Sequence, residues 1–186
     1  MGNGSTRSER SASTVSWAWL TYGSRLHKNY GVMNESHMVK VAFPLDAEHS
    51  GGIERERLWA TPQADGTYRI ENSPFHAYEI SYCDCVYANL QSGDLVFAKI
   101  ARRGGHSTYR LRLPRHKEHG YFLEIWPQLA SLGCTYESTA DERRIYSIDL
   151  PPSVDVRKVY DVLTGLEQVG IVEFEEGHYC GPSANH

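Results

Sequence analysis

The stretch RRGGHSTYRLRLPR, residues 102–115, lies where the hydrophobic period of the chain changes. Before it, from VKVAFPL at residues 39–45 onward, short β-like segments alternate with turn residues and show no helical period. After Pro114, apolar residues return at helical spacing. The strand expected at 108–113 is therefore the junction between two kinds of structure, and the fold depends on which strands flank it.

The region before the junction predicts a small N-terminal β-barrel or a coiled antiparallel sheet. Glycine-containing turns join its strands: Asp65-Gly66 between ERLWATP and GTYRIEN, Ser92-Gly93 between DCVYANL and DLVFAKIA, and Gly104-Gly105 between AKIARR and HSTYRLRL. Several short strands at close spacing favour a barrel. We assign residues 39–107 to a β-barrel-like subdomain.

The region after the junction predicts a ferredoxin-like α+β unit over residues 108–177. One helix carries apolar residues from Phe122 to Leu132 and stops at Gly133, and a second follows Ser153 as its N-cap. CTYES, RRIYSIDL and IVEFEE are expected strands. With 108–113 as the first strand, the order strand, helix, strand, strand, helix, strand is ferredoxin-like. The fold class is therefore α+β.

The two ends of the chain lack these patterns. Residues 1–38 are rich in Ser, Gly and Arg, so we expect a disordered leader, and we expect a flexible tail at 178–186. Translation could start at Met1, Met33 or Met38. The core is expected to contain the following large side chains: Trp59, Phe75, Tyr109, Phe122, Trp126, Leu129, Val159, Leu163 and Phe174.

Composition narrows the functional classes. A net charge of -4 and a pI near 6.1 argue against general nucleic-acid or membrane-surface binding. The longest apolar runs are far too short to span a membrane. Four cysteines without a secretory leader suggest free thiols in a reducing compartment. We therefore expect a cytoplasmic protein, and nothing in the sequence implies a cofactor.

Several separated motifs are shared with a known family. They are LWATPQADGTYRIENSPF, ISYCDCVYA, GGHSTYRLRL, LASLGCTYE and IDLPPSVDV. Together they resemble the bacterial family catalogued as domain of unknown function 4265, over roughly residues 39–177. The resemblance implies a compact cytoplasmic bacterial protein and brings no assigned activity, cofactor or catalytic residue. The chain departs from the usual family pattern at Cys83 and Cys85, which weakens any functional role for these thiols.

Two groups of polar residues invite a chemical interpretation. Cys83-Asp84-Cys85 could suggest a metal site, but a one-residue spacer does not form the two-residue knuckle of zinc sites, so we expect structural thiols and no metal. His106-Ser107 with Asp84 could be drawn as base, nucleophile and orienting carboxylate, although adjacent strand residues face opposite sides of a sheet. His106 is the one catalytic candidate, and a polar shoulder of a hairpin is the alternative.

The basic residues around the junction are the most informative feature. Residues 95–117 contain no carboxylate. If Gly104-Gly105 forms a two-residue turn, Lys99 opposes Arg110. Five basic side chains then share one face, and their repulsion must be offset: Lys99, Arg103, His106, Arg110 and Arg112. An anionic partner or internal carboxylates could provide that offset. The candidate binding residues are Lys99, Arg102, Arg103, His106, Arg110 and Arg112.

The α+β unit offers internal carboxylates to the same residues. In a ferredoxin-like sheet the last strand lies beside the first, so Arg110 and Arg112 would face Glu173 and Glu175. A strand flanked on both sides in that sheet has no free edge for AKIARR, so this prediction competes with the hairpin. The two predictions are compatible if one long strand serves the barrel with its first half, near His106, and the α+β sheet with its second half. In that case Arg110 and Arg112 are structural, and only Lys99, Arg102, Arg103 and His106 remain as an anion-facing lip.

Three functional hypotheses follow. The leading one is a non-enzymatic binding protein for another protein or an anionic partner, for example an immunity or antitoxin-like protein. The second is a small enzyme that uses His106 as acid or base on an anionic or phosphorylated substrate held by Arg110 and Arg112. The third, single-stranded nucleic-acid binding, needs aromatic rings among the charges, and only Phe97 and Tyr109 are near. We expect nucleic acid and membrane not to be partners.

Overall fold

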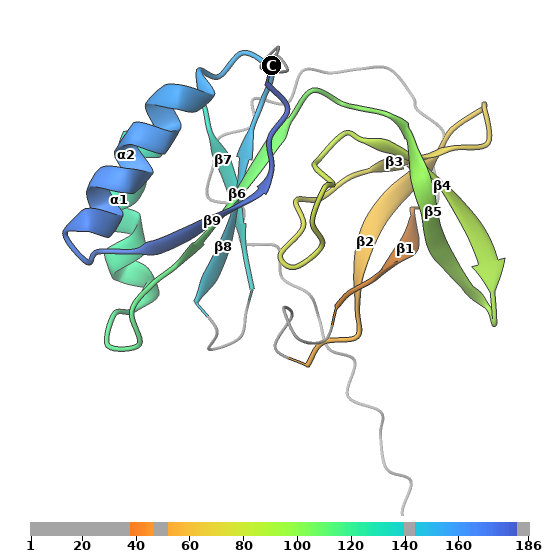
Figure 1. Ribbon diagram of the computed structural model, residues 1–186, viewed down its shortest axis with the longest axis horizontal. Coiled ribbons are helices and arrows are strands. Elements are labelled where there is room, and N and C mark those ends of the chain that lie inside the picture. The colour runs from red at the N-terminus through yellow and green to blue at the C-terminus, as the bar shows by residue number, and fades with distance from the viewer. Residues whose placement is uncertain (1–37, 47–51, 140–143, 182–186) are drawn as a thin grey trace, which may run out of the picture.

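The computed structural model describes residues 38–46, 52–139 and 144–181. Most of the expected leader, with Met1 and Met33, and the expected tail from residue 182 onward lie outside these ranges. In Figure 1 a barrel stands beside a second sheet, and two helices cover the face of that sheet that is turned away from the barrel. The fold is therefore α+β with a β-barrel.

The barrel is built from consecutive strands. β1 (Val39–Pro44), β2 (Arg55–Pro62), β3 (Tyr68–Ile70), β4 (Cys85–Gln91) and β5 (Asp94–Arg102) each pair antiparallel with the next, and β5 closes in parallel on β1. Val41, Leu58 and Ile70 are among the side chains that fill its interior. Of the two predicted alternatives, a barrel and a coiled sheet, the barrel is confirmed, and it is closed.

The second sheet contains β6 (Ser107–Arg112), β7 (Thr135–Ser138), β8 (Ile145–Leu150) and β9 (Glu173–His178) in the order β7-β8-β6-β9. All neighbouring strands are antiparallel. Helix α1 (His119–Ala130) connects β6 to β7, and α2 (Val156–Gln168) connects β8 to β9. The last strand lies beside β6, as the sequence predicted.

The predicted hairpin across Gly104-Gly105 is wrong. Both edges of β5 are used inside the barrel, by β4 and β1, and both edges of β6 are used by β8 and β9. Neither strand has a free edge for the other, so the two glycines carry the chain from the barrel to the sheet. Lys99 consequently pairs with Tyr87 across β4 and β5 and does not oppose Arg110.

The helices follow the predicted periods with one correction at a cap. The N-cap of α2 is Asp155, whose carboxylate accepts the backbone N–H of Arg157 at 3.1 Å, and not Ser153. Gly170, with φ 69°, follows the end of α2 as expected. In the described part of the chain, neither helix is long and apolar enough to cross a membrane.

The core largely matches the expected residues. Those that are buried are Tyr109, Phe122, Leu129, Val159 and Leu163. Those that are half-buried are Trp59, Phe75, Trp126 and Phe174. Trp126 and Phe174 pack against the cluster between the helices and the second sheet, so the helical register and the last strand were read correctly. All four cysteines are free, as predicted.

Candidate functional site

The loop 71–84 between β3 and β4 lies between the barrel and the second sheet (Figure 1). From the barrel, the Glu56 carboxylate accepts the backbone N–H groups of residues 75–77 at 2.7 to 2.9 Å. From the second sheet, the Ser147 hydroxyl donates to the Pro74 carbonyl oxygen at 2.7 Å. Both halves of the fold therefore hold this loop through buried or half-buried hydrogen bonds.

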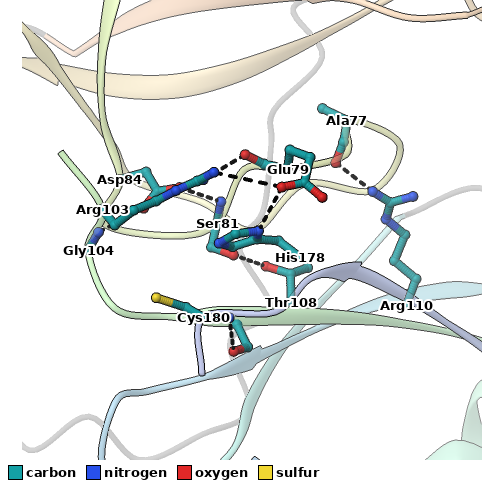
Figure 2. Close-up of polar contacts among 11 residues, drawn as sticks. Ala77, Glu79, Ser81, Asp84, Arg103, Gly104, Thr108, Arg110, His178 and Cys180 are labelled. Atoms are coloured by element: carbon teal, nitrogen blue, oxygen red, sulfur yellow. Dashed lines mark hydrogen bonds and ion pairs between the residues drawn. The ribbon is translucent and has the colours of Figure 1, made fainter. Parts of the chain in front are cut away.

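Asp84 at the end of this loop is fully buried and accepts several hydrogen bonds (Figure 2). Its carboxylate oxygens accept the backbone N–H of Ser81 at 3.0 Å, the backbone N–H of Gly104 at 2.7 Å and Nη1 of Arg103 at 3.0 Å. The Ser81 hydroxyl also shares a hydrogen bond of 2.8 Å with that of Thr108 in β6. Arg103 thus neutralises a buried charge, which is a structural role.

Glu79 forms a second contact between loop and sheet in Figure 2. Arg103 donates to its backbone carbonyl at 2.7 Å, and Nδ1 of His178 lies 3.4 Å from its Oε2. Nε2 of His178 is buried and has no hydrogen-bond partner among the described residues. His178 ends β9, and the next residues remain ordered against β6, since the Cys180 N–H donates to the Ser107 hydroxyl at 2.9 Å.

The predicted internal pairing holds for one arginine of β6. Arg110 is buried, and its Nη1 donates to Glu175 at 2.9 Å. Its other terminal nitrogen donates to a backbone carbonyl of loop 71–84, and its guanidinium lies 4.2 Å from the centre of the Tyr78 ring. Arg112 lies opposite Glu173 in the ladder but is exposed and forms no ion pair with any described residue.

The remaining basic candidates lie apart from each other. Arg102 donates to the Cys85 sulfur at 3.1 Å, and its guanidinium is 3.8 Å from the Asp65 carboxylate. Lys99 lies over the Tyr87 ring at 5.2 Å on the barrel surface. The five basic residues that were expected to share one face therefore do not form it, because β5 and β6 belong to different sheets.

His106 is oriented by a carboxylate that the sequence did not point to. Its Nδ1 lies 2.8 Å from Oδ1 of Asp149, and the Thr135 hydroxyl is 3.4 Å from the other oxygen of Asp149. Asp84, which could be drawn from the sequence as the orienting carboxylate, does not fill that role, because its oxygens accept hydrogen bonds from other donors. Nε2 of His106 has no partner among the described residues, so the pair has the arrangement of a general base and its orienting carboxylate.

Two of the described thiols, Cys134 and Cys83, are poorly suited to act as a nucleophile beside this pair. Burial raises the pKa of Cys134 to about 12, with a further contribution from the charge of Asp149. Burial also raises the pKa of Cys83. Both thiols therefore stay protonated at neutral pH, and the thiolate is the reactive form. The described residues contain no group of three or more His, Cys, Asp or Glu side chains that could hold a metal ion.

A shallow open groove of about 280 Å³ lies between α2 and β9. The sequence did not indicate this groove, because Tyr160 fits the apolar stripe of α2. In the structure, however, 49 % of Tyr160 is exposed. The Tyr109 hydroxyl donates to Oε2 of Glu176 at 3.0 Å at the base of the groove. The lining residues are Tyr109, Val156, Arg157, Tyr160, Asp161, Glu176 and Tyr179.

Comparison with known proteins identifies the family. The family model described as "Domain of unknown function (DUF4265)" matches residues 56–174. The chain belongs to this family. A solved structure, "Novel crystal structure of a hypothetical protein from Neisseria gonorrhoeae", shares the fold of this DUF4265 protein with a TM-score of 0.64 and 18% sequence identity, over 82% of this chain and 100% of that chain. No curated protein matches.

The DUF4265 match covers most of the features described above. It includes loop 71–84, His106, Asp149 and α2, and it ends just before the last groove residues, Glu176 and Tyr179. The polar groups between barrel and sheet are mostly saturated by each other, so they join the two halves of the fold. In the part of the chain that the structure describes, two places remain available for contact with another molecule. They are Nε2 of His106 and the groove between α2 and β9.

Proposed function

We propose that this DUF4265 protein is a non-enzymatic binding protein, and that another protein docks on the groove between α2 and β9. The observation that supports this proposal is the exposure of Tyr160 and Tyr179, at 49 % and 42 %, beside charged residues in an open groove. Tyrosine and arginine are enriched at the energetic centres of protein interfaces. An immunity or antitoxin-like role in the cytoplasm is one concrete form of this function.

A protein partner is favoured over the other ligands considered. The anion-facing lip loses support because two of its members, Arg102 and Arg103, lie against carboxylates of the chain itself, those of Asp65 and Asp84. Single-stranded nucleic-acid binding loses its stacking rings, since Phe97 stacks on Phe43 in the barrel and Tyr109 is buried. Among the described residues, the groove is an exposed feature that these internal contacts leave unused.

Site-specific crosslinking tests the proposal in cells. We place the photo-reactive residue p-benzoylphenylalanine at Tyr179 in the groove or at Tyr87 on the barrel, which has a matched exposure of 43 %. Irradiation of the native host should yield a discrete crosslinked protein from position 179 that is missing from position 87. The same products from both positions, or none from position 179, would overturn the proposal.

A second candidate function is acid or base catalysis by His106. It is favoured by the 2.8 Å contact with Asp149 together with the unpartnered Nε2. The test is a screen of phosphate and carboxylate esters at several pH values, comparing the wild type with His106→Gln. Turnover that the variant lacks would support catalysis, whereas equal rates in both proteins would remove it.

We also infer that β6 to β9 with α1 and α2 form a ferredoxin-like unit over residues 108–177. The chain order β6-α1-β7-β8-α2-β9 and the sheet order β7-β8-β6-β9 support it. On this division, residues 39–107 are the barrel-like subdomain. The Gly104-Gly105 connection then belongs to the barrel side of the boundary.

A further inference from the structure

We infer that the groove between α2 and β9 binds a basic side chain of the protein partner, with arginine preferred over lysine. The inference rests on the proposed function and specifies the chemistry of the partner at that site. It is supported by the exposed rings, by the charges of the lining and by the shape of the groove. Each of these is derived from the described residues.

The first support is a pair of exposed tyrosines that lack a cation. A cation over the face of an aromatic ring is attracted by the ring electrons. On the barrel, Lys99 covers the ring of Tyr87, which is about as exposed as Tyr160 and Tyr179. No Lys or Arg of the described chain lies over Tyr160 or Tyr179. The other covered rings are those of the pairs Lys40–Trp59, Arg110–Tyr78 and Lys117–Tyr121.

The second support is an excess of negative charge in the groove. Its charged lining consists of the carboxylates of Asp161 and Glu176 and the guanidinium of Arg157. Asp161 forms no hydrogen bond or ion pair with any residue that the structure describes, although Arg157 precedes it by four residues on α2, at a spacing that would allow one. One oxygen of Glu176 is bound by the Tyr109 hydroxyl, and its other oxygen has no partner in the described ranges.

Tyr109 keeps its hydrogen bond to Glu176 as the pH rises above neutral. Burial and the hydrogen bond to Glu176 raise the pKa of Tyr109 well above its usual value. The phenol therefore stays neutral and continues to donate to the carboxylate, which fixes Glu176 with its free oxygen available. A fixed acceptor loses less conformational entropy on binding than a mobile one.

The third support is the fit between the groove and one side chain. A guanidinium is planar, stacks on tyrosine and donates to a carboxylate through two N–H groups at once, whereas an ammonium is a compact, strongly hydrated charge. The groove is smaller than most pockets for drug-sized ligands and is open to solvent. It therefore suits a single side chain projecting from a protein surface.

Titration of the full chain with defined peptides tests the inference. The probe is acetyl-Gly-Arg-Gly-Arg-Gly-amide, followed by amide chemical shifts of the ¹⁵N-labelled protein. The neutral control replaces arginine by citrulline, which keeps the shape of the side chain, and a third peptide carries lysine. We expect the arginine peptide to shift amides in the first turns of α2 and at residues 176–179, the lysine peptide to bind more weakly, and the citrulline peptide to leave them unchanged.

Variants assign the binding to the groove. Asp161→Asn and Tyr160→Ala should each weaken the arginine peptide about three-fold, as expected for an exposed ion pair or cation–π contact. Arg157→Ala should strengthen it, because the competing cation is removed. Tyr87→Ala is the matched control and should change nothing. Asp161→Asn is nearly isosteric on the helix surface, so it keeps the test valid if Tyr160→Ala disturbs the packing against Phe174.

The outcomes separate the inference from the proposed function. Equal shifts with the arginine and citrulline peptides, or unchanged affinity in Asp161→Asn and Arg157→Ala, would overturn the basic side chain as the occupant. A partner crosslinked at Tyr179 through a segment without Arg or Lys would also overturn it while leaving the binding function in place. Groove-specific binding of the arginine peptide without any crosslinked partner supports the cation site and counts against the proposed function.

Discussion

Replacing Asp84 by asparagine should destabilise the protein strongly. The carboxylate accepts N–H groups on both oxygens: Gly104 on one, Ser81 and Arg103 on the other. An asparagine offers one oxygen and one NH₂ group. Whichever way the amide is placed, its NH₂ group points at a donor, so that donor loses its acceptor at residue 84, which is fully buried.

The loss in free energy of unfolding can be worked out from the contacts that Asp84→Asn removes. With the amide oxygen toward Arg103, the backbone N–H of Gly104 becomes unsatisfied, at a cost of about 1–3 kcal/mol, and the bond to Arg103 loses its charge assistance. Removing one charge of a buried pair costs about 3–5 kcal/mol. The Arg103 side chain is 35% exposed and can be rehydrated, so we expect the lower end, about 3 kcal/mol in the free energy of unfolding.

Urea unfolding measures this loss. With a slope of about 2 kcal/mol per molar, the midpoint for Asp84→Asn should fall by about 1.5 M at unchanged slope. The matched control is Asp94→Asn, because Asp94 also binds arginines, Arg55 at 3.2 Å and Arg57 at 2.8 Å, but its side chain is 38% exposed. It should cost less than about 1 kcal/mol. Equal losses in the two variants would refute the reasoning that burial makes the Asp84 contacts strong.

Three further predictions concern the same molecule. Gly104→Ala should lower the free energy of unfolding, measured in urea, by about 2 kcal/mol or more, because the added Cβ would lie 2.5 Å from the backbone of Cys83. A variant as stable as the wild type would show that the backbone moves easily to make room. Burial raises the pKa of Tyr146 to about 12. The free energy of unfolding should therefore fall by about 2–3 kcal/mol as the pH rises from 10 toward 12. In urea unfolding at alkaline pH, Tyr146→Phe should lose less stability over that range than the wild type. Cys134 is buried and should react with a thiol reagent only after unfolding, whereas half-exposed Cys180 should react in the native protein. Mass spectrometry locates the labelled cysteines, and labelling of both in the native protein would contradict the burial of Cys134.

The barrel was predictable because its turns carry local signals. Ser92 and Gly93 both have positive φ, at 50° and 89°, which is the geometry of a tight hairpin turn. The Gly104-Gly105 pair resembles the Ser92-Gly93 turn in sequence, but it carries the chain from the barrel to the second sheet. Gly104 is needed because a side chain there would collide with the backbone of Cys83. A glycine pair predicts that the chain bends, and the partners of the flanking strands depend on long-range pairing.

The candidate site was only partly predictable for a related reason. His106 could be named as a candidate from its place at the junction, but the carboxylate beside it, that of Asp149, comes from β8, which lies beside β6 only in the folded sheet. Tyr160 fits the helical period of α2 yet lies at the edge of its apolar face, where the end of β9 leaves a groove. Periodicity locates a face to within about one position, and exposure at its edge is decided by the neighbouring strand.

The order of the strands also determines when each half of the protein can form during synthesis. All barrel strands lie within residues 39–102, so the barrel can close early on the ribosome. β6, in contrast, is flanked by β9, which emerges last of the described strands, and Arg110 meets Glu175 only then. Until that moment a nascent chain carries an unpaired strand edge and an uncompensated cation. A stall before residue 173 would therefore leave a folded barrel attached to an incomplete, aggregation-prone sheet.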